Sequence, residues 1–455
     1  MRDPGQQYPG DSGNYARILP LGPEMSSAGL GIQSLMIHET RPVSSVYTGR
    51  GAAALKSAVC QETVRLCEGL HGGGLLAIVL TGSLARDEAT FIREGERRKL
   101  LGDAEFLLVF DQNGELPCSS TVDRLGGEIE QRLLEGGLSA HVELSPVHTR
   151  YLRTMPPEIF AYELQTCGQV VWGEREILSL IPAFSPADIP LEDGWRMLCN
   201  RMVEFIEVID PVVEKPVDPS PDGRYRMIKL YLDMATSFLL FQGAYAPTYL
   251  ERAERLRALA EDTKANRSCP YPLRGFTERV IYCTQFKLQA GSAVNAPAPE
   301  EGWGDMFSWA DVVTYAGGLW RWELERLTGE QLSDRELMKR WMRLQPVRKR
   351  LRGWASAVRR CGWHRSWRQW PHWVRLGWRG SPRYWVYAAA SEFFFHLHVI
   401  LKGGFGGEVD SELQSIRSRL PVAGGLSGTG GSLSWRDVAA DIVWNYHAFL
   451  KGTRT

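Results

Sequence analysis

The spacing of hydrophobic residues predicts alternating helices and strands in the first part of the chain. Apolar positions recur at helical spacing over residues 52–70, and a run of glycines then separates this helix from a continuous apolar stretch. Residues 120–137 carry a second apolar helical stripe that ends in glycines, which often terminate helices. Apolar runs and two-residue alternation indicate strands at 75–80, 104–110 and 138–147. We therefore expect an α/β (α+β) domain with a mixed sheet over residues 46–185.

Beyond residue 185 the strand signals fade and helical spacing dominates, so we expect a mainly α-helical domain over residues 186–455. Its predicted helices span 195–209, 226–243, 310–327, 334–344, 385–401 and 435–450. Residues 403–431 hold nine glycines and are expected to form loop around one short helix. Residues 1–45 lack sustained periodicity and are expected to form a flexible N-terminal arm.

Composition narrows the class of protein. The chain has 455 residues, and its 53 basic and 53 acidic side chains give a formal net charge of zero. Its eight cysteines include no C-x-x-C pair, which favours reduced thiols and a cytoplasmic protein over a disulfide framework or a zinc site. No stretch reaches 18 uninterrupted apolar residues and no signal peptide is evident, so we expect no transmembrane segment.

The charge is unevenly distributed along the chain. Residues 337–391 contain fourteen Lys or Arg, no Asp or Glu, and eight of the sixteen tryptophans. Indoles could stack on bases or sugars while arginines contact phosphates, or both could lie at a lipid headgroup boundary. Alternatively, the tryptophans form a core and the arginines surround it. The basic segment suits an anionic acceptor, and nucleic acid, a sugar phosphate and a lipid-linked glycan remain open.

Asp103 and Glu105 interrupt an otherwise apolar strand. Residues two apart on a strand point to the same face, so the two carboxylates would share one volume. Hard oxygen ligands favour Mg²⁺ or Mn²⁺, and Glu143 on the next predicted strand could supply a third ligand. The alternative is that the acid pair forms the solvated face of an edge strand.

The preceding strand ends at Gly82-Ser83 and runs into a predicted helix. Free backbone N–H groups at such a turn favour a phosphate, glycine permits close approach, and serine adds a hydroxyl donor.

These residues together resemble the nucleotidyltransferases of the DNA polymerase β type. The shared pattern is an apolar strand ending in Gly82-Ser83, then Asp103-Ala104-Glu105 on a second strand, then a third acid at Glu143. The D-x-E form and the glutamate as third acid resemble the aminoglycoside nucleotidyltransferases in that group. The sequence FAYELQTCGQVVWGEREIL (160–178) is similar to the stretch in which many small bacterial members enter their helical domain. The resemblance covers about residues 52–260.

The resemblance implies a metal-dependent enzyme that moves a nucleoside monophosphate from a nucleoside triphosphate to an acceptor hydroxyl and releases pyrophosphate. Asp103, Glu105 and Glu143 would be the catalytic and metal-binding residues. The nucleotide-binding residues would be Gly82, Ser83, Arg86 and Lys229. Lys229 could instead be an ordinary surface lysine of the helical domain.

The chain departs from the family pattern at two places. Asp87 stands where the family often has glycine, and twenty positions separate Ser83 from Asp103, about twice the usual number. Two alternatives therefore remain open. One is a non-catalytic nucleotide-binding or interaction protein on the same fold, and the other is a synthase of nucleotide second messengers.

Overall fold

The computed structural model describes residues 48–450 except 95–96, 209–220, 264–265, 267–268, 290–307, 362, 402–406 and 423–432. The predicted N-terminal arm, residues 1–45, lies outside the described residues. The described residues belong to one compact unit.

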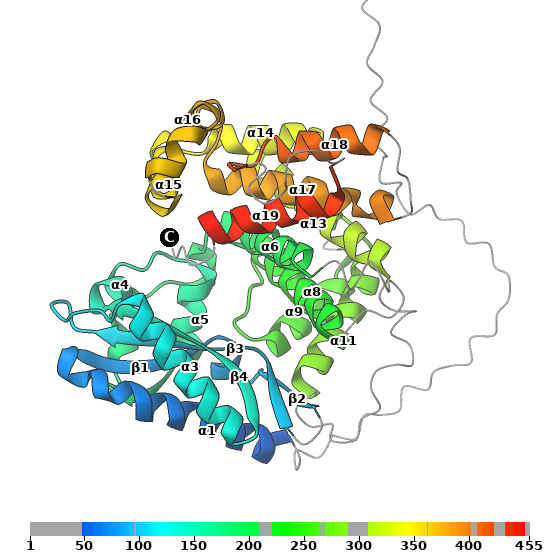
Figure 1. Cartoon of the computed structure of the whole chain (residues 1–455). Helices are drawn as coiled ribbons and strands as arrows, with labels where there is room; N and C mark the ends of the chain where they lie inside the picture. The colour runs from blue at the N-terminus through cyan, green and yellow to red at the C-terminus, as the bar shows by residue number, and fades with distance from the viewer. Residues whose placement is uncertain are drawn as a thin grey trace, which may run out of the picture. The chain divides into compact units, whose positions relative to one another are not determined.

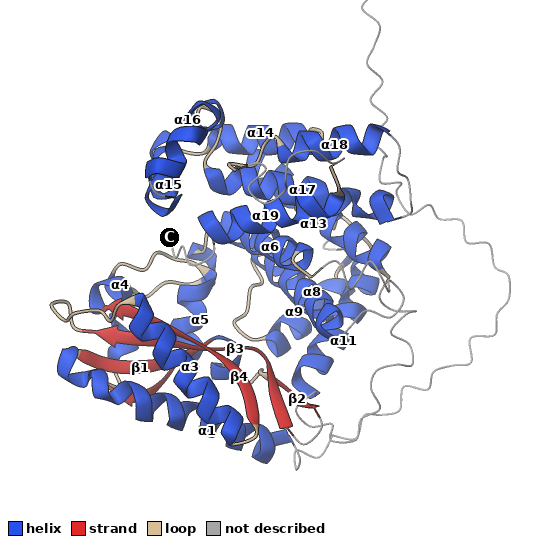
Figure 2. Cartoon of the chain, in the orientation of Figure 1, coloured by secondary structure: helices blue, strands red, loops and turns tan. Residues whose placement is uncertain are grey.

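The sheet is built around one long strand, β3, as Figure 2 shows in red. Its five strands are β1 (Leu75–Thr81), β2 (Thr90–Glu94), β3 (Arg97–Phe110), β4 (Leu138–His148) and β5 (Gln169–Gly173). Strand β4 runs parallel to β3, whereas β1 and β2 are antiparallel to β3 and β5 is antiparallel to β1. The predicted mixed sheet is therefore confirmed.

Strands β1 and β2 pair with different parts of β3, both along the edge opposite to the one that pairs with β4. Strand β2 pairs with Arg97–Leu101, and β1 pairs with β3 only from Glu105 to Phe110. Between these two stretches Gly102 has a φ of 104°, a left-handed conformation that suits glycine. The prediction that this strand begins near Ala104 was wrong by seven residues. The polar sequence before it forms a hairpin of β2 and β3, which accommodates the long separation between Ser83 and Asp103.

Helices cover both faces of the sheet (Figure 1). On one face, α1 (Thr48–Cys67) and α3 (Ser119–Glu135) pack on alternate residues of β3, such as Phe106. On the other face, α4 (Thr149–Arg153) and α5 (Ile159–Cys167) pack on the intervening residues, such as Leu107. This two-residue alternation is what a strand buried on both faces requires.

Strand β5 is the last strand in the described residues, and helices follow it. They are α6 (Leu191–Ile206), α8 (Pro221–Phe241), α9 (Tyr249–Glu261), α11 (Leu273–Gln289), α13 (Trp309–Thr328), α14 (Asp334–Leu344), α15 (Val347–Cys361), α16 (Trp363–Gly377), α17 (Pro382–Leu401), α18 (Gly407–Arg417) and α19 (Trp435–Phe449). The six helices predicted after residue 185 are present. One large aromatic core joins them, with Trp195, Tyr231 and Phe394 fully buried within it. In the part of the chain that the structure describes, no helix has the length and apolar character needed to cross a membrane.

Candidate functional site

The turn after β1 lies directly against Glu105 of β3. Thr81, the last residue of β1, pairs with Glu105, and Gly82 follows with a φ of 69°. A Cβ atom at position 82 would lie 3.0 Å from the Glu105 Oε1 atom. Glycine is therefore required both by the left-handed backbone and by the close approach of the carboxylate.

The parallel pairing of β3 and β4 places the predicted acids side by side. Glu105 is in register with Glu143, and Asp103 is in register with His141. Neighbouring strands lie about 4.8 Å apart, and paired residues point to the same side of the sheet. Asp103 and Glu143 are exposed and Glu105 is half-buried. The three predicted carboxylates thus share one face, the one that α4 and α5 cover farther along the strands.

These carboxylates share a face without converging on one point. Among the described residues, no group of three or more His, Cys, Asp or Glu side chains is arranged to hold a metal ion. The donor set itself consists of carboxylate oxygens, which suits Mg²⁺ or Mn²⁺. Metal binding would require the Asp103 and Glu143 side chains to turn toward Glu105, which their exposure allows.

The predicted helix after Gly82-Ser83 is only a single turn, α2 (Gly82–Ala85). Four residues align few peptide dipoles, so this helix adds little field at the turn. A phosphate contact here would depend on local backbone N–H groups and on the Ser83 hydroxyl. That hydroxyl makes no hydrogen bond to any residue that the structure describes.

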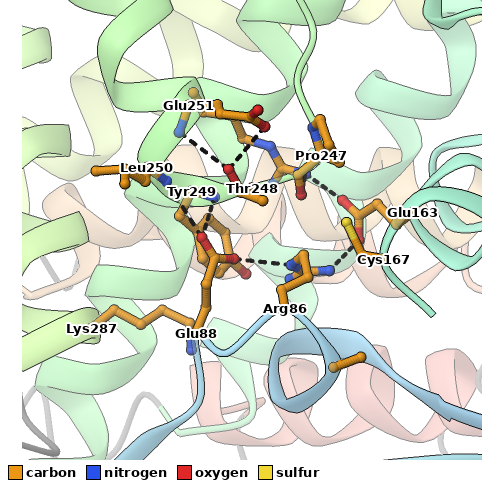
Figure 3. A network of polar contacts seen from close by, with 12 residues as sticks. Arg86, Glu88, Glu163, Cys167, Pro247, Thr248, Tyr249, Leu250, Glu251 and Lys287 are labelled. Atoms are coloured by element: carbon orange, nitrogen blue, oxygen red, sulfur yellow. Dashed lines mark hydrogen bonds and ion pairs between the residues drawn. The ribbon is translucent and has the colours of Figure 1, made fainter. Parts of the chain in front are cut away.

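Arg86 is held in a buried network of ion pairs (Figure 3). Its guanidinium donates to Glu88 at 2.9 Å and to Glu163 of α5 at 2.5 Å. Glu163 also accepts from Arg252 of α9 and, at 2.8 Å, from the Tyr245 hydroxyl. Burial disfavours the charged carboxylate, but Arg86 and Arg252 hold the pKa of Glu163 below its ordinary value. Arg86 would have to leave two carboxylates to reach a phosphate, so its contacts are those of a structural residue.

Asp87, the departure from the family pattern, pairs with a lysine of α1. It is the only non-glycine residue with a positive φ among the described residues, and its carboxylate pairs with Lys56 of α1 at 2.6 Å. The negative charge of Asp87 is thus partly neutralised by a neighbouring helix.

Helix α8 brings Lys229 against the kink of β3. The Lys229 Nζ atom lies 3.9 Å from the position that a Cβ atom on Gly102 would take. Gly102 directly precedes Asp103 in the chain. The nearby Tyr225 hydroxyl donates to the Leu101 carbonyl at 2.6 Å, which fixes this end of α8 on the strand. Burial lowers the pKa of Lys229. Lys229 is therefore half-buried beside the candidate site and is not an ordinary surface lysine.

A second lysine, Lys287 of α11, lies nearby and was not predicted from the sequence. It is 1% exposed, and its ammonium donates to the Tyr225 hydroxyl at 3.2 Å. The Thr90 hydroxyl of β2 donates to the Lys287 carbonyl at 3.1 Å, which ties α11 to the sheet. Burial lowers the pKa of Lys287 as well. Its sequence neighbours carry no motif, so only the tertiary fold reveals this residue.

The tryptophans of residues 337–391 divide into two groups. Trp341, Trp373 and Trp385 are buried, and Trp354 is half-buried. The indoles of Trp354, Trp373 and Trp385 each donate to a backbone carbonyl, so they belong to the core. Two others, Trp370 and Trp378, are exposed. The side chains of Trp363 and Trp367 lie outside the described residues.

Comparisons with protein-family models, with curated proteins and with solved structures found no match.

Proposed function

We propose that this protein is a metal-dependent nucleotidyltransferase that transfers a nucleoside monophosphate to an acceptor hydroxyl and releases pyrophosphate. One observation carries the proposal. The turn at Gly82 meets Glu105 at the end of β1, and the same point of β3 places Asp103 two residues away and Glu143 in register on β4. A glycine turn beside three carboxylates is the arrangement that a triphosphate with its metal ions requires.

The roles that we assign follow from the position of each side chain. The carboxylates of Asp103, Glu105 and Glu143 would hold Mg²⁺ or Mn²⁺, which when bound neutralises the triphosphate charge and lowers the pKa of the attacking hydroxyl. The backbone at Gly82 would approach the terminal phosphates, and the Ser83 hydroxyl would donate to one of them.

Lys229 would supply positive charge beside the carboxylates, since its Nζ atom lies close to β3 at Gly102. The desolvation that lowers its pKa also strengthens its attraction to a phosphate, because the local dielectric is low.

One observation favours a second candidate, a non-catalytic nucleotide-binding protein on the same fold. The three carboxylates do not converge among the described residues, and Arg86 is committed to Glu88 and Glu163. A protein of this kind would bind a triphosphate without releasing pyrophosphate.

Pyrophosphate release in the presence of Mg²⁺ or Mn²⁺ separates these candidates. We would test the four nucleoside triphosphates against nucleic acid, sugar-phosphate and lipid-linked acceptors. Asp103→Asn and Glu105→Gln should each abolish release, because losing one ligand leaves the metal ions undercharged. Asp123→Asn, at an exposed aspartate of α3, is the matched control and should keep wild-type turnover. Release that persists in both site variants would place the reaction elsewhere.

A further inference from the structure

The exposed apolar residues of this protein are concentrated on the helical hairpin of α15 and α16 and just before it, where Leu344 ends α14. Eleven large hydrophobic residues are exposed in the described part of the chain, and six of them fall between residues 344 and 378. They are Leu344, Val347, Leu351, Trp370, Val374 and Trp378. Exposed apolar residues scattered singly need no explanation, but a concentration of this kind marks an interaction surface.

The exposed residues form a stripe on each helix of the hairpin. Val347 and Leu351 are four residues apart on α15, and Trp370 and Val374 follow the same spacing on α16. Trp378 continues this spacing in the turn directly after α16. Residues four apart lie on one face of a helix. Leu351 is 66% exposed and Trp378 is 86% exposed, so the apolar area reaches well into solvent.

The hairpin is packed, so these residues are not a core left open. The Trp354 and Trp373 rings meet at a centroid distance of 5.5 Å between the two helices. The Arg350 guanidinium donates to the Trp378 carbonyl at 2.8 Å and ties the start of α15 to the end of α16. A Cβ on Gly377 would lie 3.1 Å from the Trp354 indole nitrogen, which shows how closely the helices approach. The outward stripes are therefore additional to the packed contacts between the two helices.

Basic residues are interspersed with the stripes in the sequence, and one of them, Lys349 of α15, pairs with Glu192 at 3.5 Å. Residues 337–391 carry fourteen Lys or Arg and no Asp or Glu, so the rest of the chain has a formal net charge of −14. Arg348, Arg352 and Arg359 are exposed on α15 and form no salt bridge to any residue that the structure describes. The surface therefore complements a partner that is both anionic and apolar.

We propose that the α15–α16 hairpin docks on the surface of an anionic phospholipid bilayer. Leu351, Val374 and Trp378 enter the headgroup boundary, and the surrounding arginines contact the lipid phosphates. Exposed aliphatic side chains favour lipid over nucleic acid. Bases stack on aromatic rings and phosphates bind arginine, but neither gains a comparable contact from valine or leucine. This proposal does not depend on the proposed nucleotidyl transfer.

Sedimentation of the full chain with vesicles tests the proposal. One set of vesicles is pure phosphatidylcholine, and the other contains 30% phosphatidylglycerol. We expect binding to the anionic vesicles with a blue shift of tryptophan fluorescence, and at least roughly tenfold weaker binding to the neutral ones. The variant Leu351→Ser/Val374→Ser/Trp378→Ser should bind anionic vesicles at least tenfold more weakly, and so should Arg348→Glu/Arg352→Glu/Arg359→Glu.

Two matched controls guard against nonspecific effects. Leu250→Ser removes another exposed leucine, 53% exposed on α9, and should leave vesicle binding unchanged. Arg124→Glu/Arg257→Glu/Arg274→Glu reverses three exposed arginines outside the hairpin and should change binding less than twofold. Circular dichroism should show that every variant is folded.

Three results would overturn the proposal. The first is no binding of the wild-type chain to anionic vesicles. The second is binding by the apolar triple variant that equals wild-type binding, which would show that charge attraction alone accounts for the interaction. The third is a single-stranded or duplex oligonucleotide that binds the hairpin arginines more tightly than vesicles do and displaces them, since the surface would then be a nucleic-acid site.

Discussion

Glu163 is the acid at the centre of the buried ion-pair network, and Glu163→Gln should destabilise the protein strongly. The carboxylate lies between the guanidinium groups of Arg86 and Arg252, and both arginine side chains are almost fully buried. Glutamine keeps the shape of the side chain but removes the negative charge that the two arginines face. The buried guanidinium groups of Arg86 and Arg252 would then lack the carboxylate that they share in the wild-type protein.

The expected loss follows from this burial. Breaking a buried ion pair by removing one partner costs about 3–5 kcal/mol, because the remaining charge stays desolvated. Glu88 still pairs with Arg86 at 2.9 Å, so we expect the lower end of that range, about 3 kcal/mol in the free energy of unfolding. Arg252 keeps hydrogen bonds to the Ala246 and Pro247 carbonyls, which acts in the same direction.

The pH dependence gives an independent signature. Because the folded-state pKa of Glu163 is lowered from 4.5, its contribution is present above about pH 4.5 and is lost as the pH falls through the lower folded-state value. The difference in unfolding free energy between wild type and Glu163→Gln should therefore be constant from pH 6 to 8 and should shrink in stronger acid.

Urea denaturation followed by tryptophan fluorescence measures both effects. The control is Glu128→Gln, which removes an acid whose side chain is 40% exposed and lies 3.7 Å from both Arg124 and Arg132 on α3. Exposed pairs contribute up to about 1 kcal/mol, so this variant should lose little stability. A Glu163→Gln variant within about 0.5 kcal/mol of the control at pH 7 would show that the network contributes nothing beyond surface pairs.

Three further predictions concern single residues. Gly82→Ala forces a side chain into a left-handed backbone and against Glu105, so thermal melting should show a loss of about 1–2 kcal/mol in the free energy of unfolding. The control is Gly127→Ala on α3, where nothing lies within 4 Å of the added Cβ atom, and it should lose no stability. Equal melting temperatures for the two variants would contradict this prediction. Burial raises the pKa of Glu323 from 4.5 to about 8, so the folded state keeps a proton that the unfolded state loses and stability should fall as the pH rises from about 4.5 to about 8. Urea midpoints of Glu323→Gln should lack this slope, and a wild-type slope in the variant would assign the titration to another group. Hydrogen bonds with Ser120 and Thr121 lower the pKa of Cys118 to about 7, whereas burial raises the pKa of Cys60 to about 11. Iodoacetamide at pH 7 should therefore alkylate Cys118 before Cys60. Peptide mass mapping that finds the reverse order would refute the lowered pKa of Cys118.

The elements around the sheet could be predicted from the sequence because each buries a regular apolar pattern. Helices α1 and α3 and strands β1 and β4 have one or two apolar faces, and their bounds lie close to those predicted. Strand β2 and the start of β3 could not be predicted, because their sequence is dominated by charged residues. Cross-strand pairing such as that of Ile92 with Lys99 stabilises them, and it depends on a partner rather than on periodicity.

The carboxylates were found from the sequence because their spacing on a strand fixes a shared face. Lys287 and the network of Glu163 were not found, because their environment is assembled from residues far apart in the chain. Tyr225 lies 62 residues from Lys287, and Arg86 lies 77 residues from Glu163. A buried charged side chain is stable only where the fold brings such partners into contact. The local sequence pattern around either residue does not indicate that contact.

The proposed site is tested most directly by the metal dependence of triphosphate binding, which needs no knowledge of the acceptor. Calorimetric titration with α,β-methylene nucleoside triphosphates would be done with Mn²⁺ and with EDTA, on the wild-type chain and on Asp103→Asn, Glu105→Gln and Glu143→Gln. We predict that binding requires Mn²⁺ and weakens at least roughly tenfold in each variant, because each removes one charged ligand from the metal ions. Binding that is equally tight in EDTA, or that is unchanged in all three variants, would contradict a metal-dependent nucleotide site at the junction of β1, β3 and β4.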